Sequence, residues 1–131
     1  MAKYGTCEVC GINGIVTEHH KIKRSQQPAL IKCKMNLIDL CEKCHYSIHH
    51  GKDGHDLDET IKLQFQNYLE IVFNKDYFSR EEVQAILDIN SKSTDRLLKT
   101  LKQYKGLFAR EDIVRASMGG KLIILEEYKN E

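Results

Sequence analysis

The 131-residue chain lacks any run of about 18 apolar residues, and its N-terminus lacks the apolar stretch of a signal peptide. We therefore expect a cytoplasmic protein, in the host cell if a phage encodes it, with no membrane partner. The chain also lacks an excess of charge of either sign, because 20 Lys and Arg face 19 Asp and Glu and leave a formal net charge of +1. Any indication of a nucleic-acid partner must then come from where the basic residues lie.

The five cysteines form a pattern that favours a metal over disulfides. Cys7 with Cys10 and Cys41 with Cys44 are two Cys-x-x-Cys pairs, and Cys33, expected to be a small buried residue, is left over. In a reducing cytoplasm such pairs are typical of metal ligands. Four thiolates close a tetrahedral zinc ion and leave no position for a substrate, so we predict a structural zinc site. It would stabilise a first half that has few large apolar side chains.

Four histidines accompany the cysteines and suit a site of the opposite kind. His45 and His49 are four residues apart, which places them on one face of a helix that begins at the second cysteine pair. His19 and His20 end an expected short strand, on opposite faces unless a twist or bulge brings both to one cleft. Together with His19, the two helical histidines can bind a divalent ion and leave its other side open. His20 is then free to accept a proton near neutral pH.

A cluster of basic residues lies beside these candidate ligands. No acid interrupts it, which favours contact with phosphates, whereas a solvated loop is the alternative interpretation. The cluster consists of Lys21, Lys23, Arg24, Lys32 and Lys34.

The chain resembles the HNH endonucleases, the ββα-metal nucleases, over about residues 7 to 50. The resemblance lies in the two cysteine pairs, the adjacent histidines and the helix after the second pair. The histidine, asparagine and histidine that give the family its name correspond to His20, Asn36 and His45. The resemblance implies that His20 is the general base and that Asn36 ties the loop and orients this base. It also implies that the ligands of the catalytic ion are His19, His45 and His49.

The resemblance further implies hydrolysis of phosphodiester bonds in double-stranded DNA by nicking, with one divalent cation and a monomer or homodimer as the enzyme. Mg²⁺ is one candidate ion. Mn²⁺, Ni²⁺ and Co²⁺ are candidates as well, because a ligand set made only of histidines is softer than one that contains carboxylates. Compact enzymes of this kind resemble those of phages and mobile elements. A zinc-ribbon DNA-binding regulator that cuts nothing is the first alternative, and it leaves the four histidines without a purpose. A zinc-stabilised protein-interaction module also leaves the basic residues unexplained.

The fold class that we predict is α+β, with a boundary after residue 74. Residues 1–74 would form a zinc-stapled ββα-metal, treble-clef-like nuclease module. Its last helix would begin at a capping box of Asp56 and Glu59 and pack on the nuclease core.

Residues 75–131 are expected to form a small, winged helix-turn-helix-like DNA-binding module. Ser79 and Glu82 predict a capping box for a short helix, and a second helix would run from near Ser93 to Gly106. Segments 113–117 and 122–125 flank two glycines and are expected to pair as the hairpin wing. The second helix would present a basic stripe to DNA, formed by Lys92, Arg96, Lys99 and Lys102.

Overall fold

The computed structural model describes residues 2–51 and 53–124, and its architecture is α+β, as predicted. The first sheet has the order β1-β2-β3, with β1 (Ala2–Thr6), β2 (Asn13–His20) and β3 (Leu37–Cys41) antiparallel to their neighbours. The helix α1 (Glu42–His50) follows β3 directly. The prediction of a strand before the histidine pair and a helix after the second cysteine pair is confirmed, whereas β1 was not expected.

A loop of residues 21–36 connects β2 to β3 and contains two short 3-10 helices, η1 (Pro28–Leu30) and η2 (Lys34–Asn36). The backbone N–H of Lys21 donates to the carbonyl of Asn36 at 2.7 Å, so the two ends of the loop meet where the β2–β3 ladder stops. His20 pairs with Leu37 in the last position of that ladder. The loop therefore starts and ends beside the histidine pair.

The helix α2 (Gly54–Val72) begins against the end of α1, and a glycine makes this junction possible. A Cβ at Gly54 would lie 2.6 Å from the carbonyl oxygen of Ile48. The predicted capping box at Asp56 is wrong: Asp53 is the N-cap residue, with no side-chain capping bond, and Asp56 lies inside the first turn. The close approach at Gly54, which a capping pattern does not encode, sets the start of α2.

The second half alternates short strands and helices. β4 (Tyr77–Phe78) precedes α3 (Arg80–Leu87) and α4 (Ser91–Leu98), and the hairpin β5 (Gln103–Tyr104) and β6 (Leu107–Ala109) leads into α5 (Arg110–Ser117). The sheet order is β4-β6-β5, so β4 pairs with the far strand of the hairpin. The capping box of Ser79 and Glu82 is present at α3 as predicted.

Two predicted elements of this half are wrong. α4 ends at Leu98, well before Gly106, and Gln103 and Tyr104, expected in the helix, form β5 instead. Lys105 and Gly106 have positive φ angles, 55° and 83°, and form the tight turn that connects β5 to β6. The expected hairpin of 113–117 with 122–125 does not form, since 113–117 belong to α5, where Ile113 and Val114 are buried in the core. Leu125 lies outside the described residues.

Two hydrophobic clusters make up the core, and α2 contributes to both. The smaller lies under the first sheet and includes Ile61. The larger contains Phe65 and Leu69 of α2, so only part of the helix packs on the predicted nuclease core. It joins side chains from both sides of position 74, and the domain boundary there stays a prediction. Its members before and after that position include Ile22, Leu30, Phe73, Phe78, Val83, Leu97 and Ile113.

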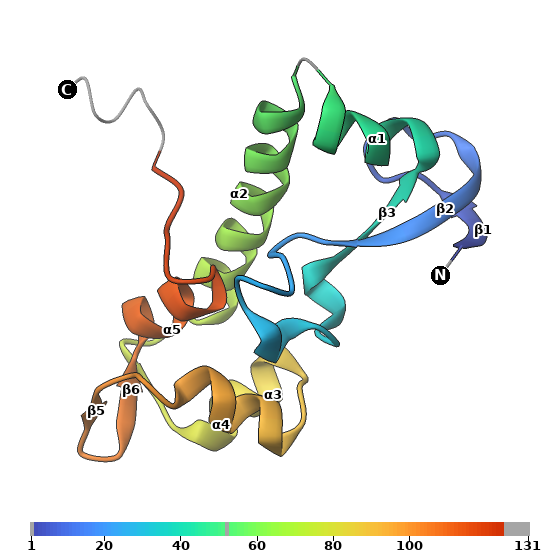
Figure 1. The fold of residues 1–131 in the computed structure, drawn as a ribbon. Helices are drawn as coiled ribbons and strands as arrows, with labels where there is room; N and C mark the ends of the chain where they lie inside the picture. Colours follow the sequence, from blue (N-terminus) through green and yellow to red (C-terminus); the bar gives the residue numbers. More distant parts are fainter. Residues whose placement is uncertain (1, 52, 125–131) are drawn as a thin grey trace.

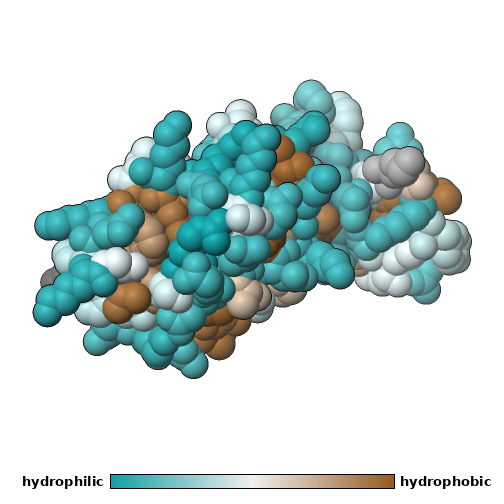
Figure 2. All heavy atoms as spheres, turned by 90° about the horizontal axis from the view of Figure 1, so that it is seen from below, coloured by the Kyte–Doolittle hydropathy of each residue, from teal (hydrophilic) through white to brown (hydrophobic). Residues whose placement is uncertain are grey.

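Figure 1 shows α2 running from the end that carries α1 and the first sheet toward the end that carries α3 and α4. Seen from below, the surface is mainly hydrophilic, and hydrophobic residues reach it in separate places (Figure 2). Among the described residues, no helix combines the length and the apolar character that crossing a membrane needs.

Candidate functional site

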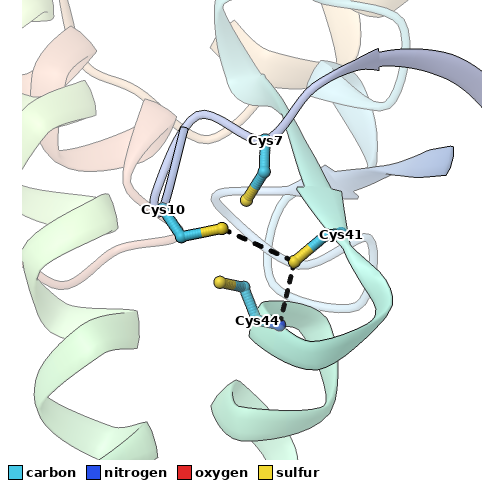
Figure 3. A group of neighbouring side chains, drawn as sticks. All are labelled: Cys7, Cys10, Cys41 and Cys44. Carbon is cyan, nitrogen blue, oxygen red and sulfur yellow. Dashed lines mark hydrogen bonds between the residues drawn. The ribbon is translucent and has the colours of Figure 1, made fainter. Parts of the chain in front are cut away.

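The four cysteines of the two Cys-x-x-Cys pairs come together as predicted. Cys7 and Cys10 lie in the β1–β2 connection, Cys41 ends β3 and Cys44 lies in the first turn of α1, and their sulfur atoms point toward one another (Figure 3). All four lie within 4.8 Å of one another. The Sγ atoms of Cys10 and Cys41 are 3.8 Å apart. Zn–S bonds of about 2.3 Å in a tetrahedron require about this separation, so the arrangement fits a zinc ion.

The protonation of the cluster also fits a cation. Burial would raise the pKa of the Cys7 thiol, but hydrogen bonds from neighbouring backbone groups outweigh it and lower this pKa to about 6. Burial and the surrounding cysteine side chains raise the pKa of Cys44 to about 12. Thiolates this close repel one another, and a bound divalent ion is what allows all four to lose their protons together.

Three histidines form a second cluster beside the first. Nitrogen atoms of His19, at the end of β2, and of His45 and His49, on α1, lie within 4.8 Å of one another. The ring centroids of His19 and His45 are 5.1 Å apart, and those of His45 and His49 are 5.4 Å apart. The predicted juxtaposition of His19 with His45 and His49 is therefore present.

The free nitrogens of this cluster fit a divalent ion. His19 is 7% exposed, and its buried Nε2 has no hydrogen-bond partner within residues 2–51 and 53–124. An uncompensated buried polar atom is costly, and a metal ion would satisfy it. His45 Nδ1 lies 3.0 Å from the Thr17 hydroxyl oxygen. This contact fixes the ring and leaves Nε2 of His45 for a ligand bond, as hydrogen bonds to the other ring nitrogen of metal-binding histidines do.

The histidines are also in the right protonation state to act as ligands. Burial, with a further contribution from the neighbouring His45, lowers the pKa of His19 to about 4. Burial also lowers the pKa of His45, and His49 adds to this effect. Both imidazoles are therefore neutral at neutral pH and can donate a lone pair to a metal ion.

The depressed pKa of His19 predicts acid sensitivity. In the unfolded chain His19 takes up a proton near pH 6.5, whereas the folded chain does not until about pH 4, so acid favours unfolding within this window. We expect the free energy of unfolding to fall by about 1 kcal/mol more in the wild type than in His19→Gln between about pH 7.0 and 5.5. Urea unfolding at both pH values, with no free metal ion in the buffer, measures this difference. Equal losses in the two proteins would contradict it.

His20 lies next to the histidine cluster with a defined orientation. Its Nε2 is 3.0 Å from the carbonyl oxygen of Ile31. A carbonyl oxygen only accepts, so Nε2 carries the proton and Nδ1 is left as the acceptor. His19 and His20 are adjacent on β2, so strand alternation would place their side chains on opposite faces. At the end of the strand, however, both line one open cleft of about 430 Å³.

Asn36 ties the loop that supports His20. The residue is fully buried, its Oδ1 accepts from the N–H of Ile22 at 2.8 Å, and its Nδ2 donates to the carbonyls of Ile22 and Leu30 at 3.2 and 3.1 Å. Leu30 precedes Ile31, whose carbonyl accepts from His20. Asn36 therefore acts on His20 through the loop backbone, since no hydrogen bond links the two side chains.

The predicted DNA-binding residues are found in three places. Lys23 and Arg24 are exposed and line the cleft of His19, His20, His45 and His49. Lys21 is half-buried outside that lining, with its ammonium 5.9 Å from the ring centroid of Phe65, and burial lowers its pKa. The stripe on and after α4 is exposed, at the end of the molecule away from α1 (Figure 1), and comprises Lys92, Arg96, Lys99 and Lys102.

Three residues near the histidines were not expected from the sequence. They are Thr17, which bonds His45, Ile31, which bonds His20, and Asp58 of α2. The negative charge of Asp58 acts to raise the pKa of His19, against the larger effect of burial. Its Oδ2 lies 3.0 Å from Lys62 Nζ. Only the i, i+4 spacing of Asp58 and Lys62 is visible in the sequence, and it gives no sign of the histidines.

Comparison of the chain with protein-family models, with curated proteins and with solved structures gave no match. The assignment of a function thus depends on the chemistry of the two clusters and of the cleft. Four thiol sulfurs and three imidazoles, each set within 4.8 Å, are two sites able to hold metal ions in one small α+β protein.

Proposed function

We propose that this protein is a metal-dependent endonuclease of the HNH type that hydrolyses phosphodiester bonds in double-stranded DNA. One observation carries the proposal: three histidines able to hold an ion share an open cleft with a fourth, oriented imidazole and with Lys23 and Arg24. A purely structural metal site does not need an adjoining base or cationic side chains, and a catalytic one does.

The two clusters have different tasks in this proposal. Cys7, Cys10, Cys41 and Cys44 hold a structural zinc ion that joins the β1–β2 connection to the start of α1. His19, His45 and His49 hold the catalytic cation, which would be Mg²⁺, Mn²⁺, Ni²⁺ or Co²⁺. When bound, such an ion supplies charge stabilisation at the scissile phosphate and at the leaving oxygen.

His20 is the general base of the proposed reaction. Its Nδ1 accepts a proton from the attacking water, while the bond from Nε2–H to the Ile31 carbonyl holds the ring in place and stabilises the imidazolium that forms. Asn36 is a positioning residue, because it fixes the loop that carries this carbonyl. Lys23 and Arg24 attract the DNA backbone to the cleft.

The second half would add affinity for DNA. The order strand, two helices and hairpin, with β4 paired to β6, supports a winged helix-turn-helix, and α4 takes the place of the recognition helix. Arg80 of α3 fixes α4, since its Nε lies 2.6 Å from Asp95 Oδ1 and its guanidinium also donates to the carbonyl of Ser91 at 2.9 Å. The exposed cations Lys92, Arg96 and Lys99 would contact phosphates.

Nicking of supercoiled plasmid tests the proposal. We expect open-circular product with Mg²⁺, Mn²⁺, Ni²⁺ or Co²⁺ and inhibition of nicking by added Zn²⁺. No open-circular product should form with a chelator that leaves the structural zinc in place. DNA binding by gel shift runs in parallel. Binding without cutting under every metal condition would favour the zinc-ribbon DNA-binding regulator over the nuclease.

A further inference from the structure

A second groove, also of about 430 Å³, adjoins the histidine cluster. His45 and His49 line both this groove and the cleft that contains His20, so the two depressions meet at the same pair of imidazoles. The other walls of the groove come from Ile15 on β2 and from Tyr46 and His50 on α1. Whatever occupies the groove is therefore in contact with the proposed reaction centre.

The groove is lined by aliphatic and aromatic side chains together with the polar Thr17 and Glu42, and it is open to solvent. Tyr46 and Ile15 are each 63% exposed. The rings of Tyr46 and His50 have centroids 4.6 Å apart and planes inclined by 36°, so they form a paired aromatic surface. Such a surface fits a flat, uncharged ring, because stacking requires only a π-face and tolerates any base.

The cleft and the groove differ in the charged residues that line them. The cleft of His20 contains Lys23 and Arg24 with one acid, Glu18. The lining of the groove contains the carboxylate of Glu42 and no Lys or Arg. A phosphodiester backbone is thus attracted to the cleft and disfavoured in the groove, whereas an uncharged base carries no such penalty there.

We infer that the groove binds an unpaired nucleobase next to the scissile phosphate, stacked on Tyr46 and His50 opposite Ile15. The inference rests on the proposed nuclease function and narrows its substrate to double-stranded DNA that contains unpaired nucleotides, such as a bulge or a flap. A base within a continuous duplex is stacked and paired, and it reaches the groove only after leaving the helix.

Fluorescence of 2-aminopurine tests the inference without any cleavage. The full-length protein, with its structural zinc but no added divalent ion, is titrated into two duplexes that carry this base either bulged or paired. We expect quenching of the bulged base and about tenfold tighter binding of the bulged duplex. Tyr46→Ala should abolish both effects, and Tyr46→Phe should keep them, because the phenyl ring still stacks.

Tyr4→Ala is the matched control, since Tyr4 is 76% exposed on β1 and does not line the groove. Equal affinity for both duplexes, or unchanged quenching in Tyr46→Ala, would overturn the inference. The inference would also be overturned if the only effect of Tyr46→Ala were to convert a dimer into monomers, because the groove would then be a contact between two copies. Quenching without cleavage of either the plasmid or the bulged duplex in any of the metals would reject the nuclease alone, and cleavage without a preference for the bulge would reject the groove alone.

Discussion

Replacement of Cys41 with serine is expected to abolish the proposed binding of structural zinc by the four cysteines and to unfold the end of the molecule that carries β1, β2, β3 and α1. Zinc bound by four thiolates contributes on the order of 10 kcal/mol to the folding of small domains. The hydrophobic cluster at this end cannot compensate, because among residues 2–51 and 53–124 it contains seven buried residues, two of which are Cys7 and Cys41 themselves. Elemental analysis of the purified protein and its thermal melt by circular dichroism measure the two effects.

Cys33→Ser is the matched control for this experiment. Cys33 is also buried, but it lies outside the four-sulfur cluster, and its Sγ contacts the carbonyl oxygen of Leu87 at 3.4 Å in the larger core. We expect this variant to keep its zinc and to lose only about 1 kcal/mol. A Cys41→Ser protein with full zinc content and an unchanged cooperative melt would show that the cluster does not hold a structural metal.

Local sequence patterns predicted the two clusters. Cys41 and Cys44, and His45 and His49, are brought together by the geometry of a single helix start, so their spacing is sufficient. The hydrogen-bonding pattern of a capping box is equally local, and the one at Ser79 is present. The one predicted at Asp56 is wrong, because the close approach to α1 at Gly54 sets the start of α2. Features of this range could be predicted where neighbouring residues alone determine them.

Features that depend on packing between distant segments were missed or wrong. The periodicity of 93–104 favours a longer helix, but Gln103 and Tyr104 pair with β6 as the strand β5, and α4 ends at Leu98. The segment 113–117 is compatible with a strand until its burial under α2 and α4 is known. Asp58 approaches His19 only because Gly54 lets α2 fold back along α1.

Replacement of His20 with alanine is expected to reduce plasmid nicking by about 10² to 10⁴-fold, the usual contribution of a general base. The variant should keep its zinc, its fold and its affinity for DNA, because His20 is only half-buried and its one side-chain hydrogen bond goes to the Ile31 carbonyl. His55→Ala is the matched control, since His55 is exposed on α2 and lines neither the cleft nor the groove. It should cut at the wild-type rate.

Replacement of His19, His45 or His49 with alanine should also reduce plasmid nicking, but for a different reason. This difference distinguishes the base from the metal ligands. Each of these variants loses one nitrogen from the ion, so the required ion concentration rises, and part of the activity should return at high Mn²⁺. His20→Ala should show no such recovery, because added metal does not replace a proton acceptor at the Nδ1 position. If His20→Ala cuts normally, the base lies elsewhere in the cleft; if Mn²⁺ rescues it as it rescues His19→Ala, the adjacent histidines share one role.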